Sequence, residues 1–477
     1  MKVKALKPLG LAFAFIVFSV CIVVSLGVLS GNRINQWDKS DAVITGSTIG
    51  ELVANKNLVT FGKAAFEDTN LSLMRNMSCA TCHSVKAGGT AGNDLGNKLV
   101  GVQPGSIFQG FDKPPSSHNV MGFRNVQTNT YSSFSPPLQR IKKDGITTFY
   151  GGNFWDGRAT GFFTGRPTQE QATQPPIGTL EGQLPSTACV VHRVLNPKTP
   201  NSYKYSYINL FGDQMKDVQW PSDIEEQCSL VDGSVNFDKT EFPFRNEKRV
   251  QVAYNNIALA MMAYQASDNI SPFSSKFDQY LNSRIDLNAS EKRGMSLFNG
   301  KAKCASCHVS TPSIKGKPPL FTDFTYDNLG VPRNPSNPFY LSKWVNAKGK
   351  NWIDLGLGGF LQGQDSYRDD ATAQMGKFKV PTVRNVGQKP SPDFVRAYMH
   401  NGYFKSLEQV VDFYDSRDVR PRCIDPFTSV ESAQAQGCWP EPEFPTTVNR
   451  TELGNLKLSV NEKTDLVSFL RSLSDRI

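Results

Sequence analysis

Two copies of one short cysteine and histidine pattern occur in this chain of 477 residues. Cys79-Ala80-Thr81-Cys82-His83 recurs as Cys304-Ala305-Ser306-Cys307-His308. Two cysteines three positions apart can both form thioethers to one porphyrin edge, and the histidine that follows is then held beneath the iron as its proximal ligand. The pattern therefore predicts two covalently bound c-type haems, with His83 and His308 as their proximal ligands.

Zinc or disulfide chemistry is the alternative for the same residues. Two Cys-x-x-Cys pairs can supply the four thiolates of a structural zinc site, or each pair can form a disulfide. Haem attachment is favoured because a histidine follows each pair and because the N-terminal segment suits export. Two of the five histidines in the chain occupy this position.

The first 30 residues are typical of an export signal. Three lysines within the first seven residues precede an uncharged apolar run from Leu9 to Leu29. This run is longer than the usual cleaved core of roughly 7–15 residues and long enough to span a bilayer. An uncleaved membrane anchor over residues 1–31 is favoured over a signal peptide removed near Ser30. Either outcome predicts a periplasmic protein, held at the inner membrane if the segment remains.

Four cysteines remain once the haem pairs and Cys21 of the apolar run are set aside. They are Cys189, Cys228, Cys423 and Cys438. In an oxidising compartment these residues predict two disulfides. Three pairings are possible, and pairing of nearest neighbours gives Cys189–Cys228 and Cys423–Cys438.

The net charge of +9 is modest for this length. No block of lysine and arginine resembles a nucleic-acid footprint, so we expect no nucleic-acid partner. The excess of positive charge indicates a solvated surface, and steering of an acidic partner is the alternative.

A related helical segment precedes each haem motif. Residues Gly62 to Phe66 end the first and Gly294 to Phe298 end the second, which indicates a duplicated haem-binding unit. The pair Asn288-x-x-Glu291 forms a capping box at the start of the second helix, and Gly300 supplies its stop.

Two further helices follow from apolar periodicity and capping. Another capping box, Ser459-x-x-Glu462, opens the last helix of the chain. The expected buried faces are Val250, Tyr254, Ile257, Ala258 and Met261 in one helix, and Leu466, Phe469, Leu470 and Leu473 in the other. Core packing fully accounts for these stripes.

Segments rich in proline, glycine and asparagine separate the helices, at 104–137, 164–200 and 330–363. We expect these long loops to wall the haem pockets. With no strand-rich segment evident, the sequence predicts an all-α protein. It would have two cytochrome c-like haem domains, over 45–265 and 266–477, after the N-terminal signal or anchor.

From about residue 50 to its end, the chain resembles the bacterial dihaem cytochrome c peroxidase family, which includes the MauG-type enzymes. The resemblance implies an N-terminal haem where peroxide reacts and a C-terminal haem that passes electrons to it. Four motifs in the family's order carry it: Cys82-His83-Ser84-Val85-Lys86-Ala87-Gly88-Gly89, Phe154-Trp155-Asp156-Gly157-Arg158-Ala159, Lys379-Val380-Pro381-Thr382-Val383-Arg384-Asn385 and Tyr398-Met399-His400-Asn401-Gly402.

The resemblance also implies sixth ligands for the two irons. His118 matches the family's distal histidine, which blocks the N-terminal haem until reductive activation moves its loop; an exposed loop histidine is the alternative. At the second haem, the peroxidase methionine falls on Tyr414, where MauG-type members carry tyrosine. A phenolate stabilises ferric iron and high oxidation states. If Tyr414 is only a core aromatic residue, Met399 is the replacement ligand.

Peroxide cleavage needs an acid–base group beside the open iron. By the resemblance, Gln171 matches the family's glutamine, Glu181 its catalytic glutamate, and Pro175 packs over the distal face. The residues around Glu181 depart from the family's usual Asn-Pro-x-Glu-Met, so an ordinary loop carboxylate is the alternative.

By the resemblance, two further residues match family residues that lie between the two haems. Trp155 matches a tryptophan that carries an electron or hole between the domains, with a buried aromatic anchor as the alternative. Asn125 matches a residue at an inter-domain calcium site, whose remaining ligands are largely backbone carbonyls near Val395 and Ala397. Calcium suits oxygen ligands of this kind.

The leading interpretation is a peroxidase that reduces hydrogen peroxide to water. Its electrons would come from a small c-type cytochrome or another periplasmic donor and pass from the C-terminal to the N-terminal haem. The first alternative is a MauG-type oxidase that uses high-valent haem to oxidise a protein or organic substrate, with Tyr414 as the discriminating residue. The second alternative is a non-enzymatic dihaem electron carrier. Family members are often dimers, so a homodimer is also expected.

Overall fold

The computed structural model describes residues 47–99, 122–196, 202–230, 234–238, 240–241, 243–343 and 345–476. The predicted signal or anchor segment and His118 lie outside these residues. Within the described ranges, no helix is both long and apolar enough to cross a membrane.

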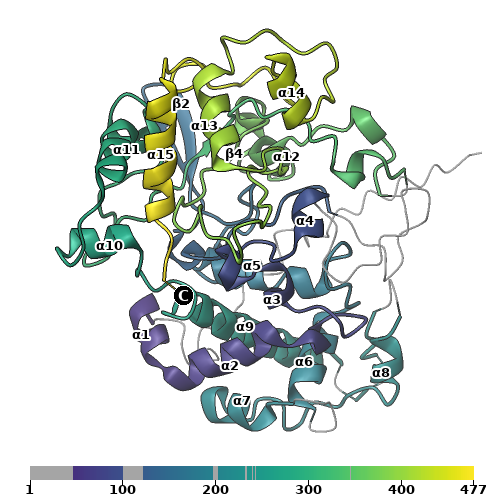
Figure 1. Cartoon of the computed structure of the whole chain (residues 1–477). Helices are drawn as coiled ribbons and strands as arrows, with labels where there is room; N and C mark the ends of the chain where they lie inside the picture. Colours follow the sequence, from purple (N-terminus) through teal and green to yellow (C-terminus); the bar gives the residue numbers. More distant parts are fainter. Residues whose placement is uncertain are drawn as a thin grey trace, which may run out of the picture. The chain divides into compact units, whose positions relative to one another are not determined.

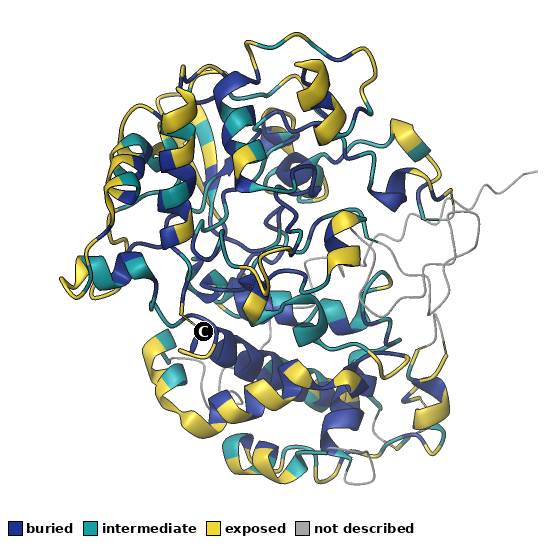
Figure 2. Ribbon diagram, viewed as in Figure 1, coloured by how far each residue is buried: buried dark blue, intermediate teal, exposed yellow. Residues whose placement is uncertain are grey.

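The first half of the chain is built on one long helix, α9 (Pro243–Ala266). Helices α2 (Lys56–Glu67), α5 (Pro167–Ala172) and α6 (Thr187–Leu195) all pack against it. Figure 2 shows α9 as mostly buried, and Figure 1 shows α2 and α6 beside it. The helix predicted from the apolar stripe at 250–261 is therefore confirmed.

Helix α2 crosses α9 at a glycine. A methyl group added at Gly62 would clash with the backbone carbonyl of Ala260. The two backbones are thus in direct contact, as only a residue without a side chain permits.

The second half repeats this arrangement with α11 (Ala289–Asn299) and α15 (Val460–Ser472), which lie side by side in Figure 1. Here a methyl group at Gly294 would clash with the carbonyl of Asp465. Helix α13 (Leu407–Ser416) also packs on α15. The predicted duplication is thus visible as two glycine crossings, each on the helix ahead of a haem motif.

The predicted capping boxes are both present. Asn288 and Glu291 exchange side-chain and backbone hydrogen bonds at the start of α11, and Gly300 is its C-cap. Ser459 and Glu462 do the same at the start of α15. Each pair satisfies amide groups that the first helical turn leaves without partners.

The other helices are short. They comprise α1 (Ile49–Ala54), α3 (Cys79–Cys82), α4 (Asp94–Lys98), α7 (Lys204–Phe211), α8 (Ile224–Gln227), α10 (Lys276–Leu281), α12 (Gly356–Gln362) and α14 (Val430–Gln436). Turns of 3-10 helix lie at Thr69–Leu71, Val85–Ala87, Ser132–Phe134, Pro175–Ile177, Cys304–Ser306, Pro338–Tyr340, Gly349–Asn351 and Arg368–Gln374.

The described residues are mainly helical, and two small antiparallel sheets add to the all-α fold that the sequence predicts. Strands β1 (Gln139–Lys143) and β2 (Ile146–Tyr150) form a hairpin, and β3 (Tyr326–Asp327) pairs with β4 (Phe378–Lys379). The hairpin turns at Asp144-Gly145, where both residues have positive φ. Asp-Gly is a strong hairpin signal. It was missed because β1 is exposed along its whole length and shows no alternation of apolar and polar residues.

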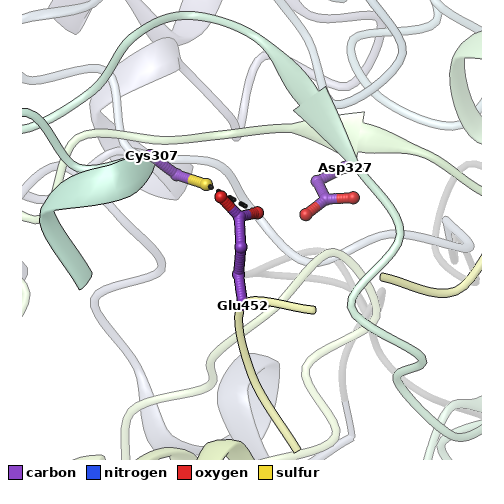
Figure 3. A group of neighbouring side chains, drawn as sticks. All are labelled: Cys307, Asp327 and Glu452. Atoms are coloured by element: carbon purple, nitrogen blue, oxygen red, sulfur yellow. Dashed lines mark hydrogen bonds between the residues drawn. The ribbon is translucent and has the colours of Figure 1, made fainter. Parts of the chain in front are cut away.

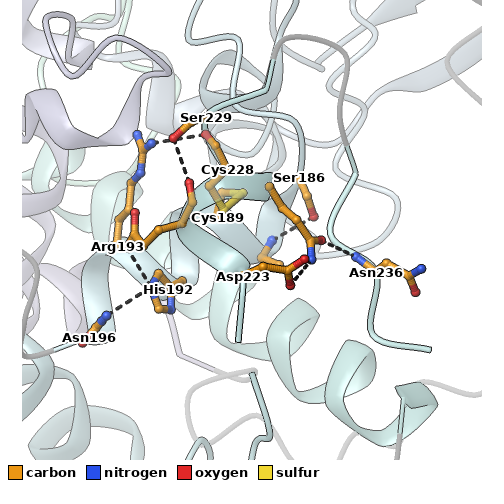
Figure 4. Close-up of a disulfide and its surroundings, with 12 residues drawn as sticks. Ser186, Cys189, His192, Arg193, Asn196, Asp223, Cys228, Ser229 and Asn236 are labelled. Atoms are coloured by element: carbon orange, nitrogen blue, oxygen red, sulfur yellow. Dashed lines mark hydrogen bonds and ion pairs between the residues drawn. A yellow bond between two sulfur atoms is a disulfide. The ribbon is translucent and has the colours of Figure 1, made fainter. Parts of the chain in front are cut away.

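Both predicted disulfides are confirmed. Cys189–Cys228 joins α6 to the end of α8 (Figure 4), and Cys423–Cys438 closes a loop that contains α14. Beside the Cys189–Cys228 disulfide, Nε2 of His192 lies 2.9 Å from a carboxylate oxygen of Glu225. This histidine therefore interacts with Glu225 and not with either haem motif.

Residues Gly46–Ile477 form one compact unit. The boundary between residues 265 and 266 stays a prediction. It coincides with the end of α9 at Ala266.

Candidate functional site

The first haem motif lies in a cavity of about 670 Å³, counted to its open mouth. Its walls come from α2, the motif, the segment 171–182 and α9. The cavity brings the predicted acid–base group and the predicted attachment residues together. The lining residues that bear on chemistry are Cys79, Cys82, His83, Gln171, Pro175 and Glu181.

Both motif histidines are held in the same way. Nδ1 of His83 lies 2.9 Å from the carbonyl oxygen of Gly89, and Nδ1 of His308 lies 3.1 Å from that of Phe321. A carbonyl can only accept a hydrogen bond, so each Nδ1 carries the proton and each Nε2 is left as the electron-pair donor. Burial lowers the pKa of both histidines, which favours the neutral form that binds iron.

The zinc and disulfide alternatives fail on geometry. The two cysteine pairs line separate cavities, and in the described part of the chain they do not come together as a metal-binding group. None of the four motif cysteines is joined in a disulfide. Burial raises the pKa of Cys79 and of Cys304 to about 12, so both are thiols, the form in which cysteine is presented for thioether formation.

Glu181 faces the first cavity under two opposing influences. Burial raises its pKa, and the positive charge of Arg158 lowers it. Arg158 is itself fixed: its guanidinium lies 3.7 Å from the ring centre of Phe154, pairs with Asp156 at 3.0 Å and donates to Gln174 at 3.3 Å. A half-buried carboxylate balanced by a fixed cation suits a group that must take up and release a proton.

The second haem motif lies in a larger cavity of about 1390 Å³, again counted to its mouth. It contains both candidates for the sixth ligand of the second iron, together with Trp155. The lining residues that bear on chemistry are Trp155, Cys304, Cys307, His308, Asp327, Lys379, Met399, His400, Tyr414, Glu443 and Glu452.

Tyr414 reaches this cavity from α13. Burial raises the pKa of its phenol well above the ordinary value, and the neighbouring Cys304 and Cys307 add to the rise. Met399 lines the same cavity from a left-handed backbone conformation with φ of 69°. The structure therefore brings both candidate ligands to the second haem motif.

Several known proteins resemble this chain in sequence and in architecture. The family model for di-haem cytochrome c peroxidase matches residues 56–286. The methylamine utilization protein MauG of Paracoccus denitrificans is 29% identical over 426 residues, which cover 89% of this chain and 90% of that protein. The cytochrome-c peroxidase IdrP1 of Pseudomonas sp. is 26% identical over 430 residues, 87% and 80% of the two chains. A variant of the diheme peroxidase BthA from Burkholderia thailandensis superimposes with a TM-score of 0.60, 25% identity and coverage of 88% and 86%.

The chain belongs to the dihaem cytochrome c peroxidase and MauG family. As a member of this family it is a haem-dependent oxidoreductase with two haem cofactors. The two cavities fit such groups, because each presents a histidine with its Nε2 available beside a pair of thiols.

The motif from Phe154 to Ala159 spans the distance between the two cavities of this family member. Trp155 lines the second cavity, is 9% exposed and donates from Nε1 to the carbonyl of Asn125 at 2.9 Å. Three residues later, Arg158 acts on Glu181 in the first cavity. Its burial and its hydrogen bond fit a buried aromatic anchor, and its role as an inter-haem carrier stays a prediction.

Asn125 lies among backbone carbonyls, as the calcium prediction requires. Its Nδ2 donates to the carbonyls of Ala397 at 3.2 Å and Met399 at 3.1 Å. A cation in this place needs the amide turned so that Oδ1 faces the carbonyls. The cluster of carbonyls fits a calcium site, and calcium binding stays a prediction.

The motif from Lys379 to Asn385 has a structural role that the sequence did not indicate. Arg384 forms a bidentate ion pair with Asp278 at 2.8 and 2.9 Å, and both side chains are almost fully buried. The guanidinium also lies against the rings of Tyr131 and Phe273, so residues from both halves of the chain meet here.

Several residues of the second cavity were missed because they carry no local pattern. Figure 3 shows Asp327 and Glu452 beside Cys307, and both carboxylates accept a hydrogen bond from Asn449 at 2.6 Å. If Cys307 forms the predicted thioether, this group has no thiolate for a metal. Glu443 was likewise missed. It lies in a loop far from any motif, and only the fold brings it to the cavity.

Proposed function

We propose that this protein is a periplasmic dihaem c-type peroxidase that reduces hydrogen peroxide to water. Its two haems would be attached covalently through Cys79 and Cys82 and through Cys304 and Cys307. The observation that carries the proposal is Glu181, a half-buried carboxylate that faces the cavity of the first motif together with Gln171.

The haem supplies the iron at which peroxide binds and from which electrons enter the oxygen–oxygen bond. The protein supplies the proton transfer. Glu181 as carboxylate accepts the proton of the inner peroxide oxygen and delivers it to the outer oxygen, which then leaves as water. Gln171 lies in the same wall and can orient the outer oxygen by hydrogen bonding.

Each proximal histidine would be held for its role by a backbone carbonyl. The bonds from Nδ1 of His83 to Gly89 and of His308 to Phe321 fix ring orientation and tautomer. Such partners of a ligating histidine also increase its basicity.

Two electrons and two protons are consumed for each peroxide. In our proposal the electrons come from a small c-type cytochrome or a similar donor, enter at the second haem and pass Trp155 to the first. His118 as distal ligand of the first iron and a homodimer belong to the same proposal and are supported by the family resemblance alone. Calcium at Asn125 is supported also by the neighbouring carbonyls, and an inner-membrane anchor over residues 1–31 by the apolar run from Leu9 to Leu29.

A second function, oxidation of a protein or organic substrate as in MauG-type enzymes, is favoured by one specific observation. Tyr414 lies in the second cavity with its phenol among the motif residues. A phenolate there stabilises ferric iron and higher oxidation states, which suits storage of oxidising equivalents.

Peroxide added to the fully oxidised and to the half-reduced protein separates the proposals. EPR and optical spectra that show a high-spin haem and peroxide turnover only after half reduction support the peroxidase. A reactive haem in the fully oxidised protein that gives a long-lived oxidised state supports the oxidase. Unchanged spectra in both forms indicate an electron carrier and contradict the proposal.

A further inference from the structure

Behind the second cavity lies a tyrosine whose proton has a buried acceptor. Tyr340 is 3% exposed, and its phenol donates to Oε1 of Glu443 at 2.8 Å. Glu443 is 4% exposed and lines the second cavity, where His400 lies 3.4 Å from its other oxygen. The phenol is therefore one hydrogen bond away from the wall of a haem cavity.

This placement distinguishes Tyr340 from other tyrosines with a carboxylate partner. Among the described residues, Tyr131 also donates to a carboxylate, that of Asp475 at 2.6 Å, and Tyr203 donates to Asp68 at 3.1 Å. Neither of those carboxylates lines a haem cavity. Because a buried tyrosine loses its proton when it is oxidised, a carboxylate at the cavity wall marks Tyr340 as a residue that can exchange an electron with that cavity.

An indole lies on the outer side of the same tyrosine. The ring centres of Tyr340 and Trp352 are 5.9 Å apart. Trp352 is half-buried, and it packs on Phe339 at 4.9 Å and Phe123 at 5.2 Å, so its position is fixed. Tyrosine and tryptophan are among the side chains that oxidise most readily by one electron at near-neutral pH, and here they form a pair that leads from behind the cavity wall toward the surface.

The surface around this pair is basic. Lys348 and Lys350 are both exposed; Lys348 caps the turn Gly349–Asn351, and Lys350 lies within it, just before Trp352. The ammonium of Lys350 also lies 5.2 Å from the ring centre of Phe427, which in turn packs on Tyr340 at 5.6 Å. A positive rim of this kind attracts a negatively charged reductant.

We propose that Tyr340 and Trp352 form a hole relay from the second haem cavity to the surface, where an anionic one-electron reductant is oxidised. The inference rests on the proposed function, in which hydrogen peroxide supplies the oxidant. One electron passes from Tyr340 to the oxidised centre in the cavity, and its phenolic proton moves to Glu443.

The relay then resets. Trp352 gives an electron to the tyrosyl radical as the proton returns from Glu443, and the oxidised indole takes an electron from the external reductant. Two such passages supply the two electrons that one peroxide requires, and the two further protons come from water.

Deuterated tyrosine tests the relay in the otherwise unmodified holoprotein. We expect a radical in samples frozen soon after peroxide addition, with an EPR signal that narrows when the tyrosine ring is deuterated. In Tyr340→Phe the tyrosyl signal is lost and the oxidised state decays several-fold more slowly. Trp352→Phe leaves a tyrosyl signal that persists. Tyr131→Phe is the matched control, because it removes a buried phenol–carboxylate bond away from both cavities.

The anionic reductant ABTS tests the outer end. Lys350→Glu should slow ABTS oxidation by about tenfold at low salt, the lower range of electrostatic steering, and leave oxidation of the uncharged donor hydroquinone unchanged. The relay is wrong if peroxide changes the haem spectra while the radical is insensitive to tyrosine deuteration and Tyr340→Phe decays like the wild type. If peroxide leaves the haem spectra unchanged, the proposed function fails and the relay fails with it.

Discussion

The positive charge of Arg158 opposes the effect of burial on the pKa of Glu181. Burial of Glu181 raises its pKa, and the guanidinium of Arg158 lowers it. Because Arg158 is fixed by Asp156 and stacks on Phe154, its charge stays in place.

Replacement of Glu181 by Gln removes the proposed acid–base group and nearly preserves shape. We expect kcat/KM for peroxide to fall by about 10²–10⁴, the usual contribution of such a group, with unchanged optical spectra. Stopped-flow peroxide reduction measures this. The matched control is Glu67→Gln, the same change at an exposed carboxylate of α2. Turnover at the wild-type rate would remove Glu181 from the mechanism.

Replacement of Arg158 by Gln should shift the pH profile of peroxide reduction. Without the cation, only burial acts on Glu181 and its pKa rises further. The carboxylate form is then lost at a higher pH than in the wild type, so activity declines earlier on acidification. Arg158→Lys keeps the charge and should keep the profile near its original position. An acidic limb that stays in place in Arg158→Gln contradicts this account.

Replacement of Tyr414 by Met should change the second haem and leave the first unchanged. A thioether favours ferrous iron, so the reduction potential of that haem should rise by more than about 60 mV, a tenfold change for one electron. Potentiometry followed by EPR measures the shift. Met399→Leu should leave both values unchanged. The opposite pattern would assign the ligand to Met399.

The glycine crossings predict where the fold tolerates no side chain. Gly294→Ala and Gly62→Ala each force a methyl group against a backbone carbonyl, so each should lower the free energy of unfolding by about 1–3 kcal/mol. Urea denaturation of the holoprotein measures this. Gly50 in α1 has its nearest neighbouring atom at 3.8 Å, so Gly50→Ala serves as the control and should be neutral or stabilising. Equal effects at all three sites would contradict the crossing model.

The two disulfides should differ in their contribution to stability. Their cysteines are 39 and 15 residues apart, which in the chain-entropy model corresponds to about 4 and about 3 kcal/mol. The double variant Cys189→Ala/Cys228→Ala should therefore unfold at lower urea than Cys423→Ala/Cys438→Ala. The reverse order would show that native contacts around α14 outweigh loop entropy.

Sequence reasoning succeeded where the signal is local. The capping box at Asn288, the disulfide partners and the apolar face of α9 are each set within a few residues or by elimination among a few cysteines. It failed at contacts between distant loops. Tyr340 and Glu443 are 103 positions apart, and Arg384 and Asp278 are 106 apart. No periodicity marks such residues, because the backbone fold alone brings them together.

The buried pair of Arg384 and Asp278 has a consequence for electron exchange. Tyr131, from the first half of the chain, lies against the same guanidinium that Asp278 holds in the second half. An ion pair shielded from water holds the guanidinium in place, because separation would leave two uncompensated charges in the interior. Tyr131 therefore packs on a fixed partner, and its phenol also donates to Asp475 of the second half at 2.6 Å. In the proposed function, this rigid contact between the two halves would keep the two haem cavities at a constant separation while surface loops vary.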